Sequence, residues 1–398
     1  MKISIFLLCV LSLLSCQSLT PTAPRPEKAE YSEDHIPLEK WGRSPNCCTA
    51  QGGKAAVASG GTYASQAGIE MLKSGGNVVD AAVATAFVLA VERPHSAGLG
   101  GGGFMTLYLK GKKPQSQFID FRETAPEKAH RDMYLDKQGE VIPDLSVIGP
   151  LSVATPGFVP GLYEIHKKFG KLPWRKLLTP AVELAFRGLK IYPSLAAHIE
   201  EKKECLLKDP QATKILFRDK SPLKEGDTLV QLDLANTLRR IAQNGSKEFK
   251  TGKTAQEIVR YMQQNQGILS LNDLKNYRVK YRAPISGQFK GWEMISAPPP
   301  SAGGVLILQM LKVLEGFPLE EISQNTPQYT HLLSEVLKRA YADRSHFVGD
   351  PEFVQVDFSK LTSDKYIEAL RKNISLTKAT PSSEIKGGQL MEDKTHTT

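Results

Sequence analysis

Arg122 is the residue of this sequence whose type and setting point most directly to chemistry. It lies in the run Asp120-Phe-Arg-Glu123, at the end of the strand-like segment QSQFIDFRE. The planar guanidinium of arginine matches a carboxylate group, which it binds through two parallel hydrogen bonds. Two interpretations stay open from the residues alone. Arg122 binds a carboxylate ligand, or it forms an internal salt bridge with Asp120, Glu123 or another acidic residue.

A glycine-rich loop, Gly98-Leu-Gly-Gly-Gly-Gly103, lies one predicted hairpin away from Arg122. It matches the GxGxxG pattern, but a dinucleotide-binding fingerprint follows a strand and opens a helix. Here a helix-like apolar segment precedes the loop and a strand-like segment follows it, so the order argues against a dinucleotide site. Consecutive glycines permit close backbone approach and free φ angles. We therefore expect this loop to support a site without supplying side chains to it. The four glycines concerned are Gly100, Gly101, Gly102 and Gly103.

A proline-rich turn, Ala297-Pro-Pro-Pro-Ser-Ala-Gly-Gly304, joins a predicted strand to a predicted helix. Three prolines hold an extended, rigid segment, and Ser301 can cap the helix. Gly303 and Gly304 would let the helix pack closely. Taken by itself, this pattern is structural.

Two familiar catalytic patterns are absent or wrongly spaced. Gly252-Lys-Thr254 resembles the end of a phosphate-binding P-loop, but the upstream glycine, Gly245, has the wrong spacing. The segment follows a helix-like stretch, so we interpret it as a helix start. The sequence contains no GxSxG motif, which removes the simplest serine-hydrolase interpretation.

The segments that must position these residues alternate between helix and strand character. Thr62 is a possible N-cap for a helix through Lys73, and Asn77 or Asp80 can cap an apolar, buried helix through about Val91. FMTLYLK and QSQFIDFRE predict a β-hairpin, and the segment 284–297 also has strand character. Strands at both ends of a helical middle predict one mixed α/β domain with sheet and helix layers. Further helices are predicted at 158–169, 173–189, 233–245, 253–265, 301–317 and 326–347.

Composition describes a folded protein with a large core. The chain has 398 residues, of which 41% are hydrophobic and 23% charged, so extensive disorder is not predicted. The net charge of +9 raises the question of nucleic-acid binding. The densest basic stretch, HKKFGKLPWRKLL at 166–178, is interleaved with Leu, Phe and Trp, which is typical of an amphipathic helix. We therefore predict no nucleic-acid partner.

The N-terminus has the pattern of an export signal. Lys2 is followed by a short apolar run that ends at Leu-Leu-Ser-Cys16, which resembles the lipobox of bacterial lipoproteins. The alternative is an ordinary secretory signal cut a little later. We expect residues 1–16 to be a signal peptide with Cys16 lipidated, and residues 17–48 to be a flexible tether. The expected location is the periplasm, with a lipid anchor as the only membrane attachment.

The remaining cysteines and the histidines predict neither a disulfide framework nor a metal site. Cys47 and Cys48 are adjacent and Cys205 is isolated, so a pair between Cys205 and one of the others stays open. The eight histidines are scattered without ligand-like spacing. No cofactor is indicated.

Seven segments, in order, resemble one family from about residue 50 to residue 398. The family is that of the γ-glutamyltranspeptidases, also called glutathione hydrolases. The segments are SGGNVVDAAVATAFVL, GLGGGGFM, IDFRETAPEKA, PISGQFKGW, APPPSAGG, YADRSHFVGDP and the terminal Thr-Thr. The resemblance implies the αββα sandwich of the N-terminal-nucleophile hydrolases, built jointly by a large and a small subunit.

The same resemblance implies roles for individual residues. Thr397 would become the N-terminal nucleophile after autocatalytic cleavage before it, with its own α-amine as base. Thr398 matches the next threonine of the family. Arg122 matches the arginine that binds the α-carboxylate of the γ-glutamyl group, which favours the ligand interpretation. The glycine loop and the proline-rich turn match segments that frame the site.

The implied reaction is acyl transfer. The nucleophile takes the γ-glutamyl group from glutathione or a related amide, and water or the amine of an amino acid or dipeptide then accepts it. Two alternatives remain. One is an acylase for β-lactam side chains or a polyglutamate hydrolase of the same superfamily, and the other is a non-catalytic remnant of the large subunit.

The resemblance also predicts an incomplete enzyme. Residues 49–396 correspond to the large-subunit domain, and 397–398 to the first residues of the small subunit. The downstream oxyanion donors of the family are not in the sequence, and one such donor is worth roughly 10²–10³-fold in rate. We therefore expect this chain alone to be inactive, to lack half of the central sheets, and to need its small subunit as a partner.

Overall fold

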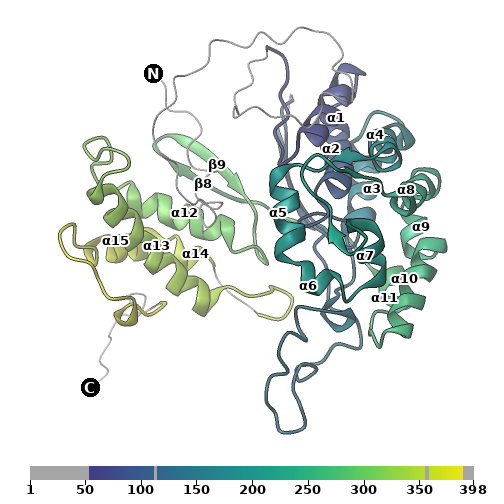
Figure 1. The fold of residues 1–398 in the computed structure, drawn as a ribbon. Coiled ribbons are helices and arrows are strands. Elements are labelled where there is room, and N and C mark those ends of the chain that lie inside the picture. The colour runs from purple at the N-terminus through teal and green to yellow at the C-terminus, as the bar shows by residue number, and fades with distance from the viewer. Residues whose placement is uncertain (1–52, 112–113, 355–357, 389–398) are drawn as a thin grey trace. The chain divides into compact units, whose positions relative to one another are not determined.

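The computed structural model describes residues 53–111, 114–354 and 358–388, which form the helices and strands shown in Figure 1. The helices are α1 (Thr62–Lys73), α2 (Val78–Glu92), α3 (Phe158–Phe169), α4 (Trp174–Arg187), α5 (Pro193–Glu201), α6 (Lys203–Leu206), α7 (Pro210–Leu216), α8 (Leu232–Asn244), α9 (Ser246–Lys250), α10 (Lys253–Gln264), α11 (Leu271–Asn276), α12 (Gly303–Leu314), α13 (Pro327–Phe347), α14 (Phe358–Leu361) and α15 (Asp364–Lys372), with 3-10 turns η3 (Pro150–Ser152) and η4 (Ser382–Glu384). The strands are β1 (Phe104–Leu109), β2 (Gln115–Asp120), β3 (Leu189–Lys190), β4 (Phe217–Arg218), β5 (Ser221–Pro222), β6 (Thr228–Leu229), β7 (Lys280–Arg282), β8 (Ile285–Phe289) and β9 (Trp292–Ser296).

Several predicted features lie outside the described residues. They are the signal peptide, Cys16, the tether, Cys47, Cys48, Thr397 and Thr398. In the described ranges, no helix is long and apolar enough to cross a membrane.

The sequence predicts the N-terminal cap of α2 but not that of α1. For α2 the prediction is confirmed, because the Asn77 side chain accepts from the N–H groups of Val79 and Asp80. For α1 it is wrong, since the N-cap is Gly61 and Thr62 is the first helical residue. The buried carboxylate of Glu92, at the end of α2, accepts the N–H of Ala64 at 3.0 Å instead. A carboxylate from another helix thus satisfies the start of α1.

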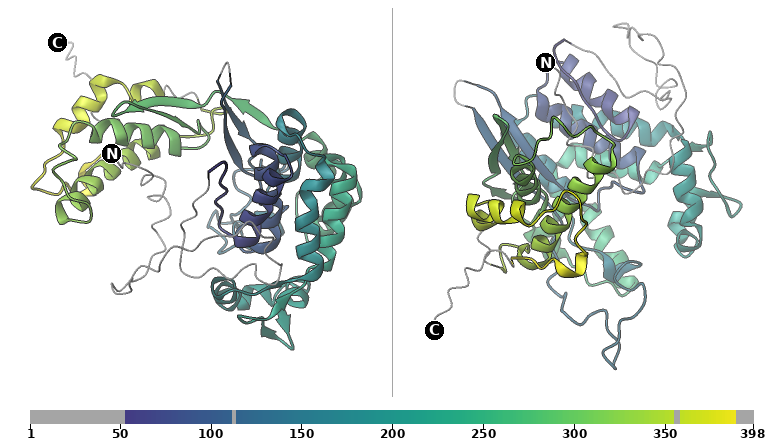
Figure 2. Two further views of the ribbon diagram at one scale, coloured as in Figure 1. Left: turned by 90° about the horizontal axis from the view of Figure 1, so that it is seen from above. Right: turned by 90° about the vertical axis from the view of Figure 1, so that its left-hand side faces the viewer.

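Helix α2 is the centre of the N-terminal helical layer. It packs against α1, α3 and α4, and these purple and teal helices lie together in both views of Figure 2. Phe87 on α2 makes edge-to-face contacts with Phe158 on α3 and Trp174 on α4, with ring centroids 5.3 and 5.5 Å apart. The prediction of a helix buried on nearly all sides is confirmed.

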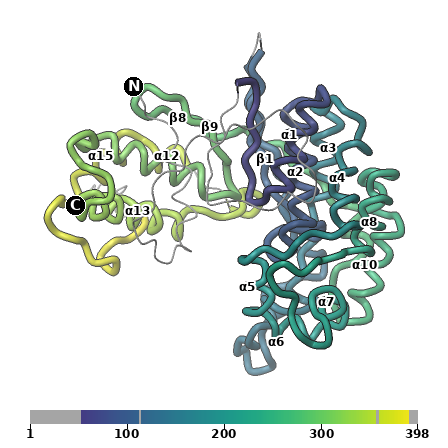
Figure 3. Tube along the Cα trace, turned by 45° about the horizontal axis from the view of Figure 1, so that its top comes forward, coloured from purple at the N-terminus to yellow at the C-terminus, as the bar shows by residue number. Residues whose placement is uncertain are grey.

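Strands β1, β2 and β7 form an antiparallel sheet in the order β1-β2-β7. The predicted hairpin is confirmed, with Phe104 opposite Asp120. Strand β7, which the sequence pattern does not predict, places Arg282 opposite Phe118. The strand-like segment 284–297 forms a separate hairpin, β8–β9, that packs along α12 (Figure 3).

The glycine loop packs directly against the residues that follow β2. Gly103 and Phe121 exchange both backbone hydrogen bonds, at 3.0 and 3.2 Å. A Cβ atom added at Gly102 would lie 2.4 Å from the Phe121 carbonyl oxygen and 2.9 Å from the Glu123 nitrogen. At Gly100 an added Cβ would meet nothing within 4 Å. The close approach therefore requires glycine at 102 and leaves position 100 free.

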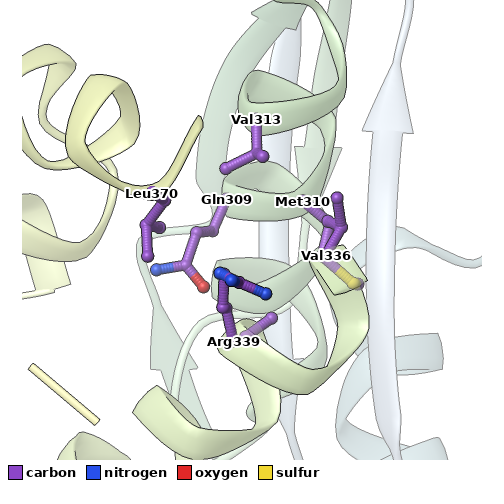
Figure 4. Close-up of a pocket in the computed structure, with 7 residues that line it drawn as sticks. Gln309, Met310, Val313, Val336, Arg339 and Leu370 are labelled. Atoms are coloured by element: carbon purple, nitrogen blue, oxygen red, sulfur yellow. The ribbon is translucent and has the colours of Figure 1, made fainter. Parts of the chain in front are cut away.

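Helices α12, α13 and α15 enclose a second core in which charged groups are buried beside apolar ones. Gln309 on α12 and Arg339 on α13 lie side by side, with Val313, Val336 and Leu370 around them (Figure 4). Arg339 donates to the Glu335 carboxylate at 2.7 Å, and both side chains are almost fully buried. These two buried charges are thus paired with each other inside the core.

Glu335 generates a prediction about acid stability. Although its burial favours the neutral carboxyl, hydrogen bonds from Lys338, Arg339 and Thr380 lower its pKa to about 2. A carboxylate with a lowered folded-state pKa stabilises the fold above the unfolded pKa, and this contribution is lost as the pH falls towards 2. Relative to Glu335→Gln, wild type should lose about 2–3 kcal/mol of unfolding free energy between about pH 5 and about pH 2.5. Urea unfolding at several pH values measures the difference in unfolding free energy between the two proteins. A difference that does not change with pH would contradict the prediction.

The glycine loop generates a second prediction, with a matched control. Gly102→Ala should lower the unfolding free energy by about 1–3 kcal/mol, because the new methyl group meets backbone atoms that cannot rotate away. Gly100→Ala should stay within about 0.5 kcal/mol of wild type, since that position is open. Thermal or urea unfolding compares the two variants. Equal stabilities would show that the loop yields at position 102.

Candidate functional site

The backbone of Arg122 is held at both of its polar groups. Its N–H donates to the Asp120 carboxylate at 3.1 Å, and its carbonyl oxygen accepts from the Tyr277 hydroxyl at 2.8 Å. The preceding residue, Phe121, is buried with its ring against Gly103 and Gly161, where an added Cβ would lie within 3 Å of it. Asp120, Tyr277 and the packing of Phe121 therefore hold the turn that carries Arg122.

The charge of Asp120 is neutralised by Arg282 on β7. Arg282 Nε donates to the second carboxylate oxygen of Asp120 at 2.9 Å, and Asp120 is only 5% exposed. Arg282 also pairs with the Glu352 carboxylate at 3.4 Å, and Lys280 donates to that Glu352 carboxylate as well. Asp120 thus links the Arg122 turn to a strand 162 residues further along the chain.

The guanidinium of Arg122 is left available. The side chain is exposed, and its Cζ lies 5.8 Å from the centroid of the Phe104 ring, within cation–π range. In the part of the chain that the structure describes, it forms no salt bridge with Asp120, Glu123 or any other acid. Of the two interpretations open from the sequence, the internal salt bridge is not found there. Ligand binding by Arg122 stays a prediction.

Tyr277 is a supporting residue that the sequence pattern does not reveal. It is 4% exposed, and burial together with the nearby charges of Asp120, Glu123 and Glu164 raises its pKa, so the hydroxyl stays protonated and can donate. An added Cβ at Gly157 would lie 2.2 Å from this hydroxyl. Its role depends on a contact 155 residues away, for which no local motif exists.

The glycine loop, the Arg122 turn and the start of α3 are tied together. The Gly101 carbonyl oxygen accepts from the N–H groups of Gly157 and Phe158, at 3.0 and 2.9 Å. Gly102 and Gly103 contact the backbone and ring of residues 121 to 123. The loop therefore supports the Arg122 turn with its backbone, through Gly101, Gly102 and Gly103.

The proline-rich turn differs in one respect from the prediction. Ser301 does not cap α12, because the N-cap is Ala302 and makes no side-chain cap bond. The Ser301 N–H instead donates to the Pro298 carbonyl oxygen at 3.1 Å, which places the serine inside the turn before the helix. Close packing is confirmed at Gly304, where a Cβ would lie 2.1 Å from the Ala297 oxygen, whereas Gly303 has space. Over the described ranges, no hydrogen bond or ion pair joins this turn to Arg122.

Other candidate groups add no further centre. Among the residues whose structure is described, no three His, Cys, Asp or Glu side chains are clustered so as to hold a metal ion. Cys205 is half-buried and forms no disulfide with a described residue. What the site offers chemically is an exposed, permanently charged planar cation on a rigid turn, which suits an anionic group such as a carboxylate.

Comparisons with known proteins assign this architecture to a family. The family model described as Gamma-glutamyltranspeptidase matches residues 64–398. The chain is 42% identical over 335 residues to the glutathione hydrolase proenzyme of Escherichia coli (strain K12), covering 84% of this chain and 57% of that protein. It is 37% identical over 356 residues to the Acylase ACY 1 proenzyme of Pseudomonas sp. (strain V22), covering 88% of this chain and 63% of that protein.

A solved structure agrees with this assignment. The crystal structure of Helicobacter pylori γ-glutamyltranspeptidase superposes with a TM-score of 0.83 at 38% identity, covering 88% of this chain and 99% of that chain. The fold class predicted from the sequence, that of the N-terminal-nucleophile hydrolases, is confirmed. The chain spans less than two thirds of the length of the two curated relatives. This chain belongs to the γ-glutamyltranspeptidase family.

Proposed function

We propose that this protein transfers γ-glutamyl groups from glutathione and related γ-glutamyl amides to water or to an amino acid or dipeptide. The observation that carries the proposal, beside the family assignment, is Arg122. Its backbone is fixed at both ends while its guanidinium is exposed and unpaired among the described residues. A γ-glutamyl group carries an α-carboxylate, for which such an arginine is suited.

The chemistry begins with the freeing of Thr397. Its hydroxyl attacks the carbonyl carbon of residue 396, the peptide nitrogen leaves as an amine, and water hydrolyses the resulting ester. The new α-amine then takes the proton of the same hydroxyl as it attacks the γ-glutamyl amide of the substrate. The substrate's amine departs with a proton, and a γ-glutamyl ester of Thr397 remains. Water or an acceptor amine attacks this ester and regenerates the threonine.

The residues around Arg122 would affect substrate binding by holding the Arg122 turn in place. Two parallel hydrogen bonds to the α-carboxylate would hold the glutamyl group at a fixed place relative to Thr397. Asp120 and Tyr277 would keep the turn in place, and neither uses up the guanidinium. Their contribution is preorganisation of the binding group.

A related acylase activity is the second candidate, and the similarity to an acylase proenzyme favours keeping it. The two activities differ in what the acyl group carries. An acylase for side chains without an α-amino acid group would not depend on a carboxylate bound by Arg122. The dependence of the rate on that carboxylate therefore separates them.

The test is Arg122→Lys in the protein expressed from its own gene. Because a bidentate, charge-assisted pair is lost, the KM for γ-glutamyl-p-nitroanilide should rise about 10- to 100-fold. With 4-aminobutanoyl-p-nitroanilide, which has no α-carboxylate, Arg122→Lys should have little effect. An unchanged KM for the γ-glutamyl compound would remove the carboxylate role, and equal rates for both compounds in wild type would favour the acylase.

The same assay carries its catalytic control. Thr397→Ala should abolish both turnover and cleavage before residue 397, followed by intact-mass spectrometry. Turnover that survives this substitution would exclude Thr397 as the nucleophile. A wild-type protein without any turnover, but with glutamate binding that depends on Arg122, would identify a non-catalytic binding protein.

We also propose that the protein is exported and lipid-anchored through Cys16. The support is the Leu-Leu-Ser-Cys16 sequence after a short apolar run. In detergent phase partitioning, wild type should enter the detergent phase and Cys16→Ala the aqueous phase. A wild-type protein that partitions into water would exclude the anchor.

A further inference from the structure

Phe104, the first residue of β1, lies between an apolar neighbour and the guanidinium of Arg122. Its ring centroid is 5.3 Å from that of the Phe118 ring, and the two ring planes are tilted by 36°. The Cζ atom of Arg122 lies over the Phe104 ring, 5.8 Å from its centroid. Phe118 is fully buried, whereas Phe104 is half-buried. The Phe104 ring therefore connects the core of the sheet with the exposed cation.

The register of β1 and β2 explains this contact. Phe104 is paired with Asp120. Because side chains alternate along an extended chain, Phe118, Asp120 and Arg122 project from one face. Phe104 is then the diagonal cross-strand neighbour of Phe118 on one side and of Arg122 on the other. Aromatic and long side chains can bridge such a diagonal.

The position directly opposite Arg122 carries no side chain. Gly103 and Phe121 exchange both backbone hydrogen bonds, so the next residue of the loop, Gly102, faces Arg122. A Cβ atom added at Gly102 would lie 3.0 Å from the carbonyl carbon of Arg122. Since glycine leaves this position open, the ring that Arg122 meets across the hairpin is that of Phe104.

The contact with the ring does not use the hydrogen-bond donors of Arg122. The N–H groups of a guanidinium lie in its plane, whereas an aromatic ring attracts the cation by its face. The attraction therefore restricts where the guanidinium lies and leaves its N–H groups available to a carboxylate.

Phe104 also gives Arg122 a neighbour other than the nearby acids. Asp120 is two residues before Arg122 on the same face, and Glu123 is the next residue in sequence. Asp120 is paired with Arg282 at 2.9 Å. Without the ring, the long Arg122 side chain would sample more rotamers. Those that approach either acid would take the guanidinium away from a ligand.

We propose that Phe104 is a positioning residue for the γ-glutamyl donor, because its ring holds the Arg122 guanidinium where it can bind the α-carboxylate. This inference rests on the proposed function, in which Arg122 binds that carboxylate. A cation–π contact at an exposed site is a weak interaction that acts on binding. Its loss should therefore raise the KM about two- to fivefold and leave kcat nearly unchanged.

The experiment compares Phe104→Leu, Phe104→Tyr and Tyr108→Leu in the protein expressed from its own gene. Leucine keeps an apolar side chain at position 104 but has no aromatic face, and tyrosine keeps the ring. Tyr108→Leu is the matched control, because Tyr108 is an exposed aromatic residue of the same strand. Among the described residues, no cation–π contact joins Tyr108 to Arg122.

Two readouts are measured on each variant. NMR relaxation of the Arg122 Nε–H group reports how rigidly the guanidinium is held. The KM is measured for γ-glutamyl-p-nitroanilide, and kcat/KM for 4-aminobutanoyl-p-nitroanilide, which has no α-carboxylate. Phe104→Leu should lower the Arg122 order parameter and raise the KM for the γ-glutamyl compound, with little effect on the other compound. Phe104→Tyr and Tyr108→Leu should match wild type in both readouts.

A double-mutant comparison tests whether Phe104 acts through the cation. In an Arg122→Gln background, Phe104→Leu should leave the KM unchanged, because the group that the ring holds is absent. The same rise in KM with and without the arginine would show that Phe104 acts by another route, and would overturn the proposal.

The other outcomes also decide the proposal. An order parameter in Phe104→Leu equal to that of wild type would overturn it, and so would a lower order parameter with an unchanged KM. An equal rise in KM in Tyr108→Leu would attribute the effect to the stability of the strand and overturn it as well. If wild type turns over neither compound, the catalytic function fails, and the Kd for L-glutamate by calorimetry replaces the KM. If L-glutamate does not bind either, the binding role of Arg122 and that of Phe104 fail together.

Discussion

The carboxylate of Asp120 is the contact on which the site depends. One oxygen holds the N–H of Arg122, and the other takes the guanidinium of Arg282 from β7. Because Asp120 is buried, its charge has to be matched, and Arg282 matches it without involving Arg122. Arg282 thus neutralises Asp120, and the guanidinium of Arg122 forms no salt bridge among the described residues. Had the two arginines exchanged partners, the turn would carry no free cation.

Other buried carboxylates of the described residues also accept backbone N–H groups. Glu92 caps α1 from the end of α2, and Asp80 accepts the N–H of Lys171 and Leu172 after α3. Glu335 and Asp343 do the same for the segment 380–388. Each of these carboxylates joins segments that are distant in sequence. Buried carboxylates are thus one source of long-range contacts, while apolar side chains supply the bulk of the burial.

Local patterns predicted the local structure well. The periodicity of apolar residues located the main helices, and the Asn77 cap and the β1–β2 hairpin followed from propensity alone. Most of the failures involve partners far along the chain, whereas the one at Ser301 is local. Thr62 was expected to cap α1 because Glu92 could not be foreseen, and Ser301 was expected to cap α12 because the geometry of the proline turn was unknown. Tyr277 and β7 carry no motif, so their part in holding Arg122 becomes visible only when the chain is folded.

The pairing of β7 with β2 has a consequence for how the protein is made. A two-stranded hairpin is marginal alone, and during synthesis β1 and β2 leave the ribosome well before residues 277–282. Until those residues arrive, Asp120 has no cation beside it and the Arg122 carbonyl has no donor from Tyr277. The helices α3 to α11 lie between β2 and β7 in the sequence, so they are synthesised before β7. The Arg122 turn is therefore completed late in translation. A nascent chain shorter than about 280 residues carries Arg122 without the contacts from Tyr277 and Arg282.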